Sequence, residues 1–371
     1  ISYLNPDIDG KAENTPYITS DFHSNSRNNP PDIGATEITL RNNDALFIEL
    51  DSLKTSYCSG INSFYGKIRN TGLDTIHSLE IECTIDNIVQ PNILLNTLIN
   101  PGDTVNNLLL HFSISDVPNA TFYITKVNNT VDSNLFRNSI STGNIYTKLS
   151  GTYTIGGLNP DFYSPANASD ALNLKGTCGN KTFLIRNGTY SGQIELNEVD
   201  TELGDTILFK SENKDASLVT LIGSQEVIKT DNVIFDMLTI KNNSNSPNIY
   251  TFKAKNIIIL KNILLRPTIS TTTNVNNSII RAKECNFIKI IDNQIKNGSY
   301  GIHLYRVDNS LISNNSISHI NYQGIRYWEC YNNKCYNNLK NITLLLKERG
   351  DIAVITKAYL KRYLTNNPEH K

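Results

Sequence analysis

The segment GIHLYRVDN at residues 301–309 recurs as GIRYWECYN at residues 324–332. The same pattern occurs twice earlier in the chain, as YTFKAKN at residues 250–256 and as IIRAKECN at residues 279–286. In the aligned segments the anchoring apolar residues are spaced by 28, 22 and 23 positions, and they are Phe252, Ile280, Ile302 and Ile325. A period in the low twenties, with several short strands in each repeat, predicts a solenoid whose coils bury each other's apolar side chains.

Asparagine-rich turns separate the strands of these repeats, and two of the asparagines, Asn293 and Asn315, are 22 positions apart. An asparagine that recurs at one corner predicts side-chain amides stacked from coil to coil, which satisfy the turn backbone. A leucine-rich repeat has a similar period, but its L-x-x-L-x-L-x-x-N frame is absent and no helix fits between the strands. The pattern therefore predicts a right-handed parallel β-helix over residues 150–343. A helix at residues 164–174, with Pro165 in its first turn, would cap the first coil.

A second β-rich domain is predicted upstream, at residues 37–148. Leu79, Ile81, Cys83 and Ile85 alternate with polar neighbours, as a strand with one buried face requires. Turn residues such as Asn100-Pro101-Gly102-Asp103 separate six or seven short strands over roughly 110 residues, which is typical of an immunoglobulin-like sandwich. The predicted fold class is therefore all-β: an Ig-like β-sandwich followed by a right-handed parallel β-helix.

The C-terminal residues 344–371 depart from the repeat. Asp351 could N-cap a helix that carries Ile352, Ile355, Ala358 or Tyr359, and Tyr363 on one face. Such a helix would cover the open end of the solenoid, although a tail foreign to the repeat is the alternative.

Composition limits the function classes. With 34 Lys and Arg against 35 Asp and Glu, the chain does not have the charge of a general nucleic-acid binder. No apolar run approaches the ~20 residues that span a bilayer, so no membrane span is predicted. An initial isoleucine and a single methionine, Met237, indicate a processed or excised piece.

Six cysteines form no CxxC pair and stand near no clustered histidines, so no zinc or other metal site is predicted. Cys58 and Cys83 fall in one predicted domain and could pair there, and Cys330 and Cys335 flank a short loop. Buried or free thiols are the alternative for each pair.

Several segments resemble a known group of proteins. GTYTIGG at residues 151–157 and GTCGNKTFLIRNGTYSGQI at residues 176–194 resemble the start of secreted β-helix proteins of the pectin-lyase-like superfamily, especially the multidomain surface proteins of Bacteroidetes. DIDG at residues 7–10 and PDIGATE at residues 31–37 are similar to the tail that closes a preceding β-helix in that group, so residues 1–36 are predicted to be such a tail or a linker. KIRNTG at residues 67–72 resembles Ig-like domains of bacterial adhesion proteins. The resemblance implies an extracellular or cell-surface location, but the fold hosts many activities.

The repeat predicts which side chains face outward. If the four apolar anchors point inward, their successors Lys253, Arg281, His303 and Arg326 form one outward column, and Lys255, Lys283, Tyr305 and Trp328 form a second. Cations beside aromatic faces suit an acidic or neutral glycan. A solvated face with long side chains lying along it is the alternative. The predicted ligand-binding residues are Lys253, Arg281, Lys283, His303, Tyr305, Arg326 and Trp328.

Three functions fit this pattern. The preferred prediction is a non-catalytic, extracellular or cell-surface module that binds polysaccharide or mediates adhesion, without a cofactor. A polysaccharide lyase or glycoside hydrolase acting on acidic polysaccharide is the second, and only a lyase would call for calcium. The Asp–Asp pair typical of β-helix hydrolases is missing, and no Asp cluster appears on adjacent coils, which counts against catalysis. A structural stalk is the third.

Overall fold

The computed structural model describes residues 8–37, 41–51, 53–85, 87–114, 119–132, 138–268, 272–338, 344–348 and 351–355. Residues 61–64, 107–114, 344–348 and 351–355 are described by their backbone alone. The chain divides between Thr147 and Lys148 into two units.

The first unit is built on two antiparallel sheets around one core. Alternate side chains of β4 (Ile76–Ile85) point into this core, where Leu79 and Ile81 are buried. They pack in one cluster with Phe47 of β1 (Ala45–Asp51), which belongs to the other sheet. The alternation along β4 therefore forms a half-buried strand, as predicted, and the unit is a two-sheet sandwich. Its kinship to immunoglobulin domains stays a prediction.

The strand order of the first sheet is β1-β3-β7, and that of the second is β10-β8-β4-β5, with β6 beside β4 and β9 beside β8. A short parallel pair joins β2 and β11. The remaining bounds are β2 Ser56–Tyr57, β3 Gly60–Asn70, β5 Ile88–Val89, β6 Ile93–Ile99, β7 Thr104–Ile114, β8 Asn119–Val127, β9 Thr130–Val131, β10 Ser139–Asn144 and β11 Tyr146–Thr147.

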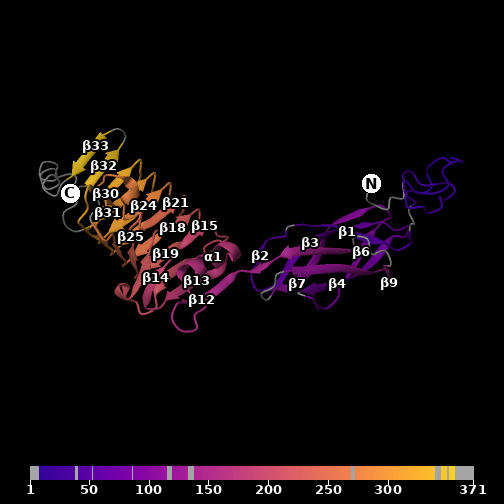
Figure 1. Cartoon of the computed structure of the whole chain (residues 1–371), viewed down its shortest axis with the longest axis horizontal. Coiled ribbons are helices and arrows are strands. Elements are labelled where there is room, and N and C mark those ends of the chain that lie inside the picture. The colour runs from indigo at the N-terminus through magenta and orange to yellow at the C-terminus, as the bar shows by residue number, and fades with distance from the viewer. Residues whose placement is uncertain are drawn as a thin grey trace. The chain divides into compact units, whose positions relative to one another are not determined.

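The second unit is a parallel β-helix of three sheets, and Figure 1 shows its strands side by side from β12 and β13 to β30 and β31. The first sheet comprises β12 Leu149–Ile155, β13 Thr177–Ile185, β16 Ile207–Ser211, β19 Val233–Asp236, β22 Ile258–Leu260, β25 Lys289–Ile291, β28 Leu311–Ser313 and β31 Lys334–Tyr336. The second comprises β14 Gly188–Ser191, β17 Val219–Ile222, β20 Thr239–Lys241, β23 Ile263–Leu265, β26 Gln294–Lys296 and β29 Ser316–Ser318. The third comprises β15 Glu195–Asn197, β18 Gln225–Ile228, β21 Ile249–Phe252, β24 Ile280–Lys283, β27 Tyr300–Tyr305, β30 Gln323–Trp328, β32 Leu344–Glu348 and β33 Asp351–Ile355. The predicted all-β class, a sandwich followed by a parallel β-helix, is confirmed.

Stacks of like side chains join the coils inside the solenoid. The ring centroids of Phe183 and Phe209 are 4.8 Å apart, and Phe235 continues the stack 6.0 Å further on. At one corner the Asn293 amide nitrogen donates to Asn315 Oδ1 at 2.9 Å, and both side chains are buried. The predicted stacking of asparagine amides from coil to coil is therefore confirmed.

A helix closes the first coil, where the sequence predicts one. In α1 (Pro165–Lys175), the hydroxyl of Ser164 accepts a hydrogen bond from the Asn167 amide, and Pro165 needs no partner in the first turn. Ala168 and Leu172 are buried in the solenoid core. The helix thus covers apolar side chains that the first coil would otherwise expose.

The helix predicted to begin at Asp351 is wrong over the residues that the structure describes there. β33 (Asp351–Ile355) runs antiparallel to β32 (Leu344–Glu348), which pairs in parallel with β30. β33 contains Ile352, Val354 and Ile355, which favour strands, and the edge of β30 offers unpaired backbone groups. Extension of the sheet therefore prevails over the helical spacing. Residues 356–371 of the predicted helix lie outside the described residues.

The cysteines divide into bonded and free groups. Cys58 is a disulfide-bonded cysteine, and so is Cys178. Cys83 is a free, buried thiol, and burial raises its pKa to about 11. The Cys58–Cys83 pairing considered from the sequence is therefore wrong, because Cys83 lies in the apolar core of the sandwich. Cys330 and Cys335 are free thiols.

Candidate functional site

The outer face of the third sheet of the solenoid carries two columns of side chains, one residue per coil. In the first column Arg281 lies opposite His303, and His303 lies opposite Arg326. In the second column Lys283, Tyr305 and Trp328 follow in the same way. Tyr250 and Phe252 of the preceding coil continue the columns, so over these four coils the first column is Tyr250, Arg281, His303 and Arg326, and the second is Phe252, Lys283, Tyr305 and Trp328.

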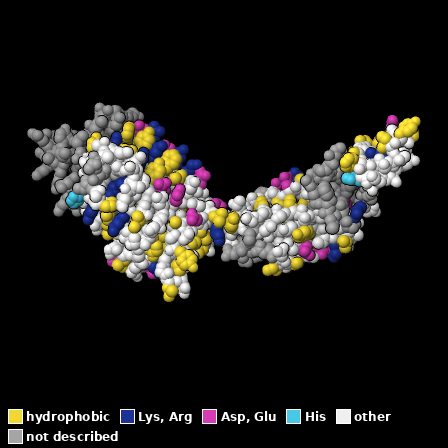
Figure 2. All heavy atoms as spheres, in the orientation of Figure 1, with side chains coloured by type: hydrophobic (Ala, Val, Ile, Leu, Met, Phe, Trp, Pro, Cys, Tyr) yellow, Lys and Arg dark blue, Asp and Glu magenta, His cyan; other side chains and the backbone are white. Residues whose placement is uncertain are grey.

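Figure 2 shows basic, hydrophobic and acidic side chains gathered along the part of the solenoid surface that carries β21, β24 and β30 in Figure 1. The inward side chains of the same strands are buried, among them Ile280, Ile302 and Ile325. These three anchors therefore point inward, as predicted from the repeat.

Lys253 and Lys255 do not lie in these columns, which corrects the predicted alignment. The counterpart of Ile280 is Ile249, not Phe252, and Phe252 lies on the outer face opposite Lys283. Lys253 has a φ of 52° and belongs to the turn after β21. The coil between Ile249 and Ile280 is longer than those that follow, because β23 ends at Leu265 and β24 begins only at Ile280. The sequence spacing therefore misplaced the anchor by three positions.

A ladder of charged side chains borders the second column in this turn. Its members all have positive φ and occupy equivalent positions on successive coils, and they are Glu198, Lys229, Lys253, Glu284, Arg306 and Glu329. Opposite charges pair along it: Lys253 Nζ lies 3.9 Å from Glu284 Oε2, and Arg306 Nε lies 2.7 Å from Glu329 Oε2. Lys283 of the second column also reaches Glu284, at 3.4 Å. The ladder thus neutralises its own charge.

Arg281 and Arg326 differ from these cations, because no carboxylate among the described residues pairs with either of them. Arg281 Nη1 donates to Asn276 Oδ1 at 2.6 Å, and Arg326 Nη1 donates to Tyr300 Oη at 2.9 Å. Both side chains are partly exposed. The first column therefore presents two guanidinium charges that neutral groups hold in place.

His303 lies between these two arginines and is buried, with only 2% of its surface exposed. This corrects the prediction that it is an exposed member of the column, because the neighbouring Arg281, Arg326 and Tyr300 cover it. Neither ring nitrogen has a hydrogen-bond partner within the described structure. Burial, with help from Arg326 and Arg281, lowers the pKa of His303 to about 3, so the ring is neutral near pH 7.

The second column presents aromatic faces beside these charges. The rings of Tyr305 and Trp328 meet at a centroid distance of 5.6 Å, and the Arg326 guanidinium lies 4.5 Å from the Trp328 ring. Lys283 Nζ lies 5.0 Å from the Phe252 ring. Aromatic surface and cations therefore alternate over adjacent coils.

The sequence prediction missed three aromatic residues of this face. Tyr250 and Phe252 open the two columns, and Tyr300 holds Arg326 from within β27. The strict alternation in Ile249-Tyr250-Thr251-Phe252 was a signal for the first two. No comparable signal marks Tyr300, because its role depends on the side-chain direction of Arg326 one coil away.

Two carboxylates lie opposite each other at the other end of the same face, on β15 and β18. Glu195 is the register partner of Glu226, and Glu226 is the register partner of Tyr250. Neighbouring carboxylates of this kind are an element of glycoside hydrolase chemistry. Among the described residues, no group of three or more His, Cys, Asp or Glu could hold a metal ion.

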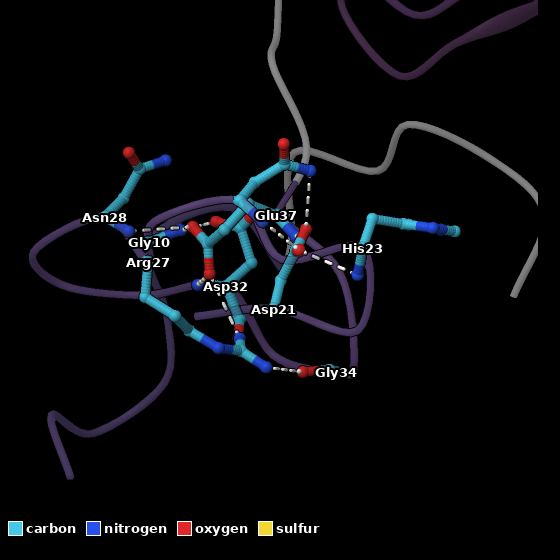
Figure 3. Close-up of polar contacts among 9 residues, drawn as sticks. Gly10, Asp21, His23, Arg27, Asn28, Asp32, Gly34 and Glu37 are labelled. Atoms are coloured by element: carbon cyan, nitrogen blue, oxygen red, sulfur yellow. Dashed lines mark hydrogen bonds and ion pairs between the residues drawn. The ribbon is translucent and has the colours of Figure 1, made fainter. Parts of the chain in front are cut away.

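A separate polar cluster organises residues 8–37 (Figure 3). Asp21 Oδ1 accepts from the amides of His23 and Asn25, and Arg27 Nη1 lies 3.0 Å from Glu37 Oε1. Burial opposes ionisation of Asp21, but hydrogen bonds led by the Glu37 amide lower its pKa to about 2. These side chains satisfy backbone groups of their own segment, so the cluster orders a loop region.

Comparisons with known proteins add a limited context. No family model and no curated protein matches the chain. Among solved structures, a cell surface protein domain from Methanosarcina acetivorans is 17% identical with a TM-score of 0.24, over 29% of this chain and 94% of that one. The catalytic domain of a GH87 alpha-1,3-glucanase in complex with nigerose is 11% identical with a TM-score of 0.33, over 78% of this chain and 59% of that one. At such low identities and TM-scores these likenesses carry no information on the function of this chain.

None of the helices in the described part of the chain has both the length and the apolar character that are needed to cross a membrane.

Proposed function

We propose that the chain is an extracellular, non-catalytic module that binds polysaccharide through the outer face of the third solenoid sheet. The observation that carries this proposal is the second column, in which Tyr305 and Trp328 lie together beside the guanidinium of Arg326. Aromatic faces pack against the apolar faces of sugar rings, and flanking donors bind their hydroxyl groups. Binding to a cell-surface glycan would make the module an adhesion domain.

The architecture supports a binding surface of this kind. Successive strands of a parallel sheet are about 4.8 Å apart, so each column offers similar contacts at regular steps along the solenoid. A linear polysaccharide also repeats at regular steps. A polymer that lies across the strands would therefore meet one row of side chains after another, and several weak contacts would add up.

The disulfide-bonded cysteines support an extracellular location. Disulfide bonds persist in oxidising compartments and are rare in the cytosol, where thiols are kept reduced. Cys58 and Cys178 are bonded.

The test is binding of the intact chain to a broad panel of immobilised polysaccharides. The proposal expects retention on at least one polymer, and Trp328→Ala should weaken that binding by about tenfold or more. Tyr331→Ala is the matched control, because Tyr331 is an aromatic residue with 59% exposure outside the two columns. Retention on no polymer, or equal loss in the two variants, would overturn the proposal.

A glycoside hydrolase is the second candidate, and the opposed pair Glu195 and Glu226 is the observation that favours it. New reducing ends during incubation with a bound polymer, abolished in Glu226→Gln, would establish hydrolysis. New unsaturated ends that depend on calcium would instead establish a lyase. Binding without either product supports the non-catalytic module.

A further inference from the structure

We propose that Arg281 and Arg326, with His303 packed beneath them, form an anion site that spans three successive coils and binds the carboxylate or sulfate groups of an acidic polysaccharide lying along the solenoid axis. This inference rests on the proposed function and deepens it, because it names the chemical class of the ligand and its direction on the surface.

The charge balance of the face is the first step. Lys253, Lys283 and Arg306 each have a carboxylate partner, in Glu284 or Glu329. Arg281 and Arg326 have none among the described residues, and their described polar contacts are with neutral oxygens. On this face, the positive charge that no described carboxylate contacts is therefore concentrated at these two arginines. An anion that binds to these two arginines gains their electrostatic attraction without first displacing a carboxylate.

The two guanidinium groups are held in place before any ligand binds. Asn276 holds Arg281, whose guanidinium carbon lies 5.7 Å from the Tyr250 ring. Tyr300 and the Trp328 ring hold Arg326. Each contact uses one N–H donor and leaves others for a ligand, since a guanidinium has five. Ordering these long side chains in advance lowers the entropic cost of binding.

The spacing of the two arginines selects the ligand and its direction. Arg281 and Arg326 lie two coils apart in one column, which corresponds to about 10 Å between their backbones. One coil is close to the length of an extended pyranose unit, so two coils match every second sugar of a polymer that runs across the strands. The site therefore suits a polysaccharide that carries anionic groups on at least every second sugar.

His303 lies beneath the two arginines and forms the base of the anion site. Its ring is buried between the two arginines, stacks at 5.3 Å on Tyr300, and has both nitrogens without a described partner. Because Arg281, Arg326 and Tyr300 cover the imidazole, it does not touch the ligand itself. The neutral ring packs beneath the two guanidinium groups and leaves them to carry the charge of the site.

The experiment compares polymers that share one backbone but differ in charge. The intact chain would be titrated with dextran, carboxymethyl dextran and dextran sulfate, together with polygalacturonate, at fixed salt. The expected result is that the anionic polymers bind at least about tenfold more tightly than dextran, and that Arg281→Gln and Arg326→Gln each remove about tenfold of this preference. The carboxymethyl and sulfate arms show which anion is preferred.

Lys289→Gln is the matched control, because Lys289 is an exposed cation on β25, in another sheet of the solenoid. Circular dichroism and unfolding midpoints check that each variant is folded. Equal affinity for neutral and anionic polymers, or an equal loss in Lys289→Gln, would overturn the anion site and leave the proposed function standing. Binding to none of the four polymers would overturn the anion site, and the proposed function would fall only if no polymer of the broad panel were retained.

Discussion

The guanidinium carbon of Arg326 lies 4.5 Å from the centroid of the Trp328 ring, two positions further along the outer face of β30. The same guanidinium donates to the hydroxyl of Tyr300 at 2.9 Å. The cation is thus fixed from two sides by aromatic residues, of which Trp328 is partly exposed and Tyr300 is buried. Both residues position the charge, and only Trp328 also offers a ring face to a ligand.

Tyr300→Phe tests this positioning role, because it removes the hydroxyl acceptor of Arg326 and keeps the buried ring. We expect affinity for carboxymethyl dextran to fall about three- to tenfold, the range of one ordinary hydrogen bond, while affinity for neutral dextran stays unchanged. Tyr322→Phe is the control, since Tyr322 is exposed and contacts the Tyr300 ring edge-on. A parallel loss for both polymers would mean that Tyr300 only supports the fold.

The asparagine ladder predicts a stability effect. Asn293 donates to the carbonyls of Ile259 and Ile291 and to Asn315 Oδ1, and its own Oδ1 accepts from the Asn262 amide. Asn293→Ala removes these hydrogen bonds, including the acceptor of the buried Asn262 backbone N–H, so we expect the free energy of unfolding to fall by about 3 kcal/mol or more.

Asn213→Ala is the control for this prediction, because Asn213 is exposed and makes one side-chain bond, to Asn187. Chemical denaturation followed by circular dichroism measures both variants. Similar losses in the two would show that the buried ladder contributes no more than a surface asparagine.

Another corner of the solenoid contains an unfavourable residue. Equivalent turn positions on successive coils have φ between 53° and 60°, and they are Asn232, Asn256, Phe287, Asn309 and Asn332. Asparagine tolerates this left-handed region, whereas a bulky residue such as Phe287 is strained there. Because the Phe287 side chain is 48% exposed, little packing offsets the strain. Phe287→Asn should therefore raise the free energy of unfolding by roughly 0.5–1 kcal/mol.

Phe287→Ala separates this backbone effect from the loss of the ring, since alanine also removes the aromatic side chain but does not favour positive φ. The midpoint of thermal unfolding, measured for both variants, distinguishes the backbone effect from the loss of the ring. If the asparagine variant is no more stable than the alanine variant, relief of backbone strain is not the cause.

The sequence predicted those parts of the solenoid where the coils keep a constant length. Ile280, Ile302 and Ile325 follow one another at 22 and 23 positions, so their inward direction and the outward direction of Arg281 and Arg326 could be predicted. The next coil upstream, between Ile249 and Ile280, is longer because β23 and β24 are far apart in the sequence. Spacing alone therefore assigned Lys253 to the wrong column.

Other features depend on contacts that a periodic pattern does not encode. Alternation places His303 on the outer face, but its burial depends on long side chains from the two neighbouring coils. The segment Asp351–Ile355 fits a helical spacing and a strand equally well, and the free edge of β30 decides between them. Tertiary contacts therefore determine both the burial of His303 and the strand at Asp351–Ile355.

His303 also predicts how stability depends on pH. Burial, then Arg326 on β30 and Arg281 on β24, lower its folded pKa from 6.5 to about 3, and the Tyr300 ring covers its other side. Between these two values the unfolded chain binds a proton that the folded chain does not, so acidification favours unfolding. The stability contributed by the neutral ring is complete above about pH 6.5 and falls progressively down to about pH 3, by up to a few kcal/mol.

His303→Leu removes this titration and keeps an apolar side chain in the buried position. We expect wild type to lose clearly more stability than His303→Leu when the pH falls from 7 to 4.5, because the other titrating groups are common to both proteins. His319→Asn is the matched control, since His319 is an exposed histidine of the same solenoid with a φ of 55°, which asparagine accepts. Denaturant unfolding at the two pH values measures the difference. An equal loss in wild type and His303→Leu would show that His303 binds its proton equally well in the folded and the unfolded protein. That result would contradict a ring that stays neutral between the two arginines.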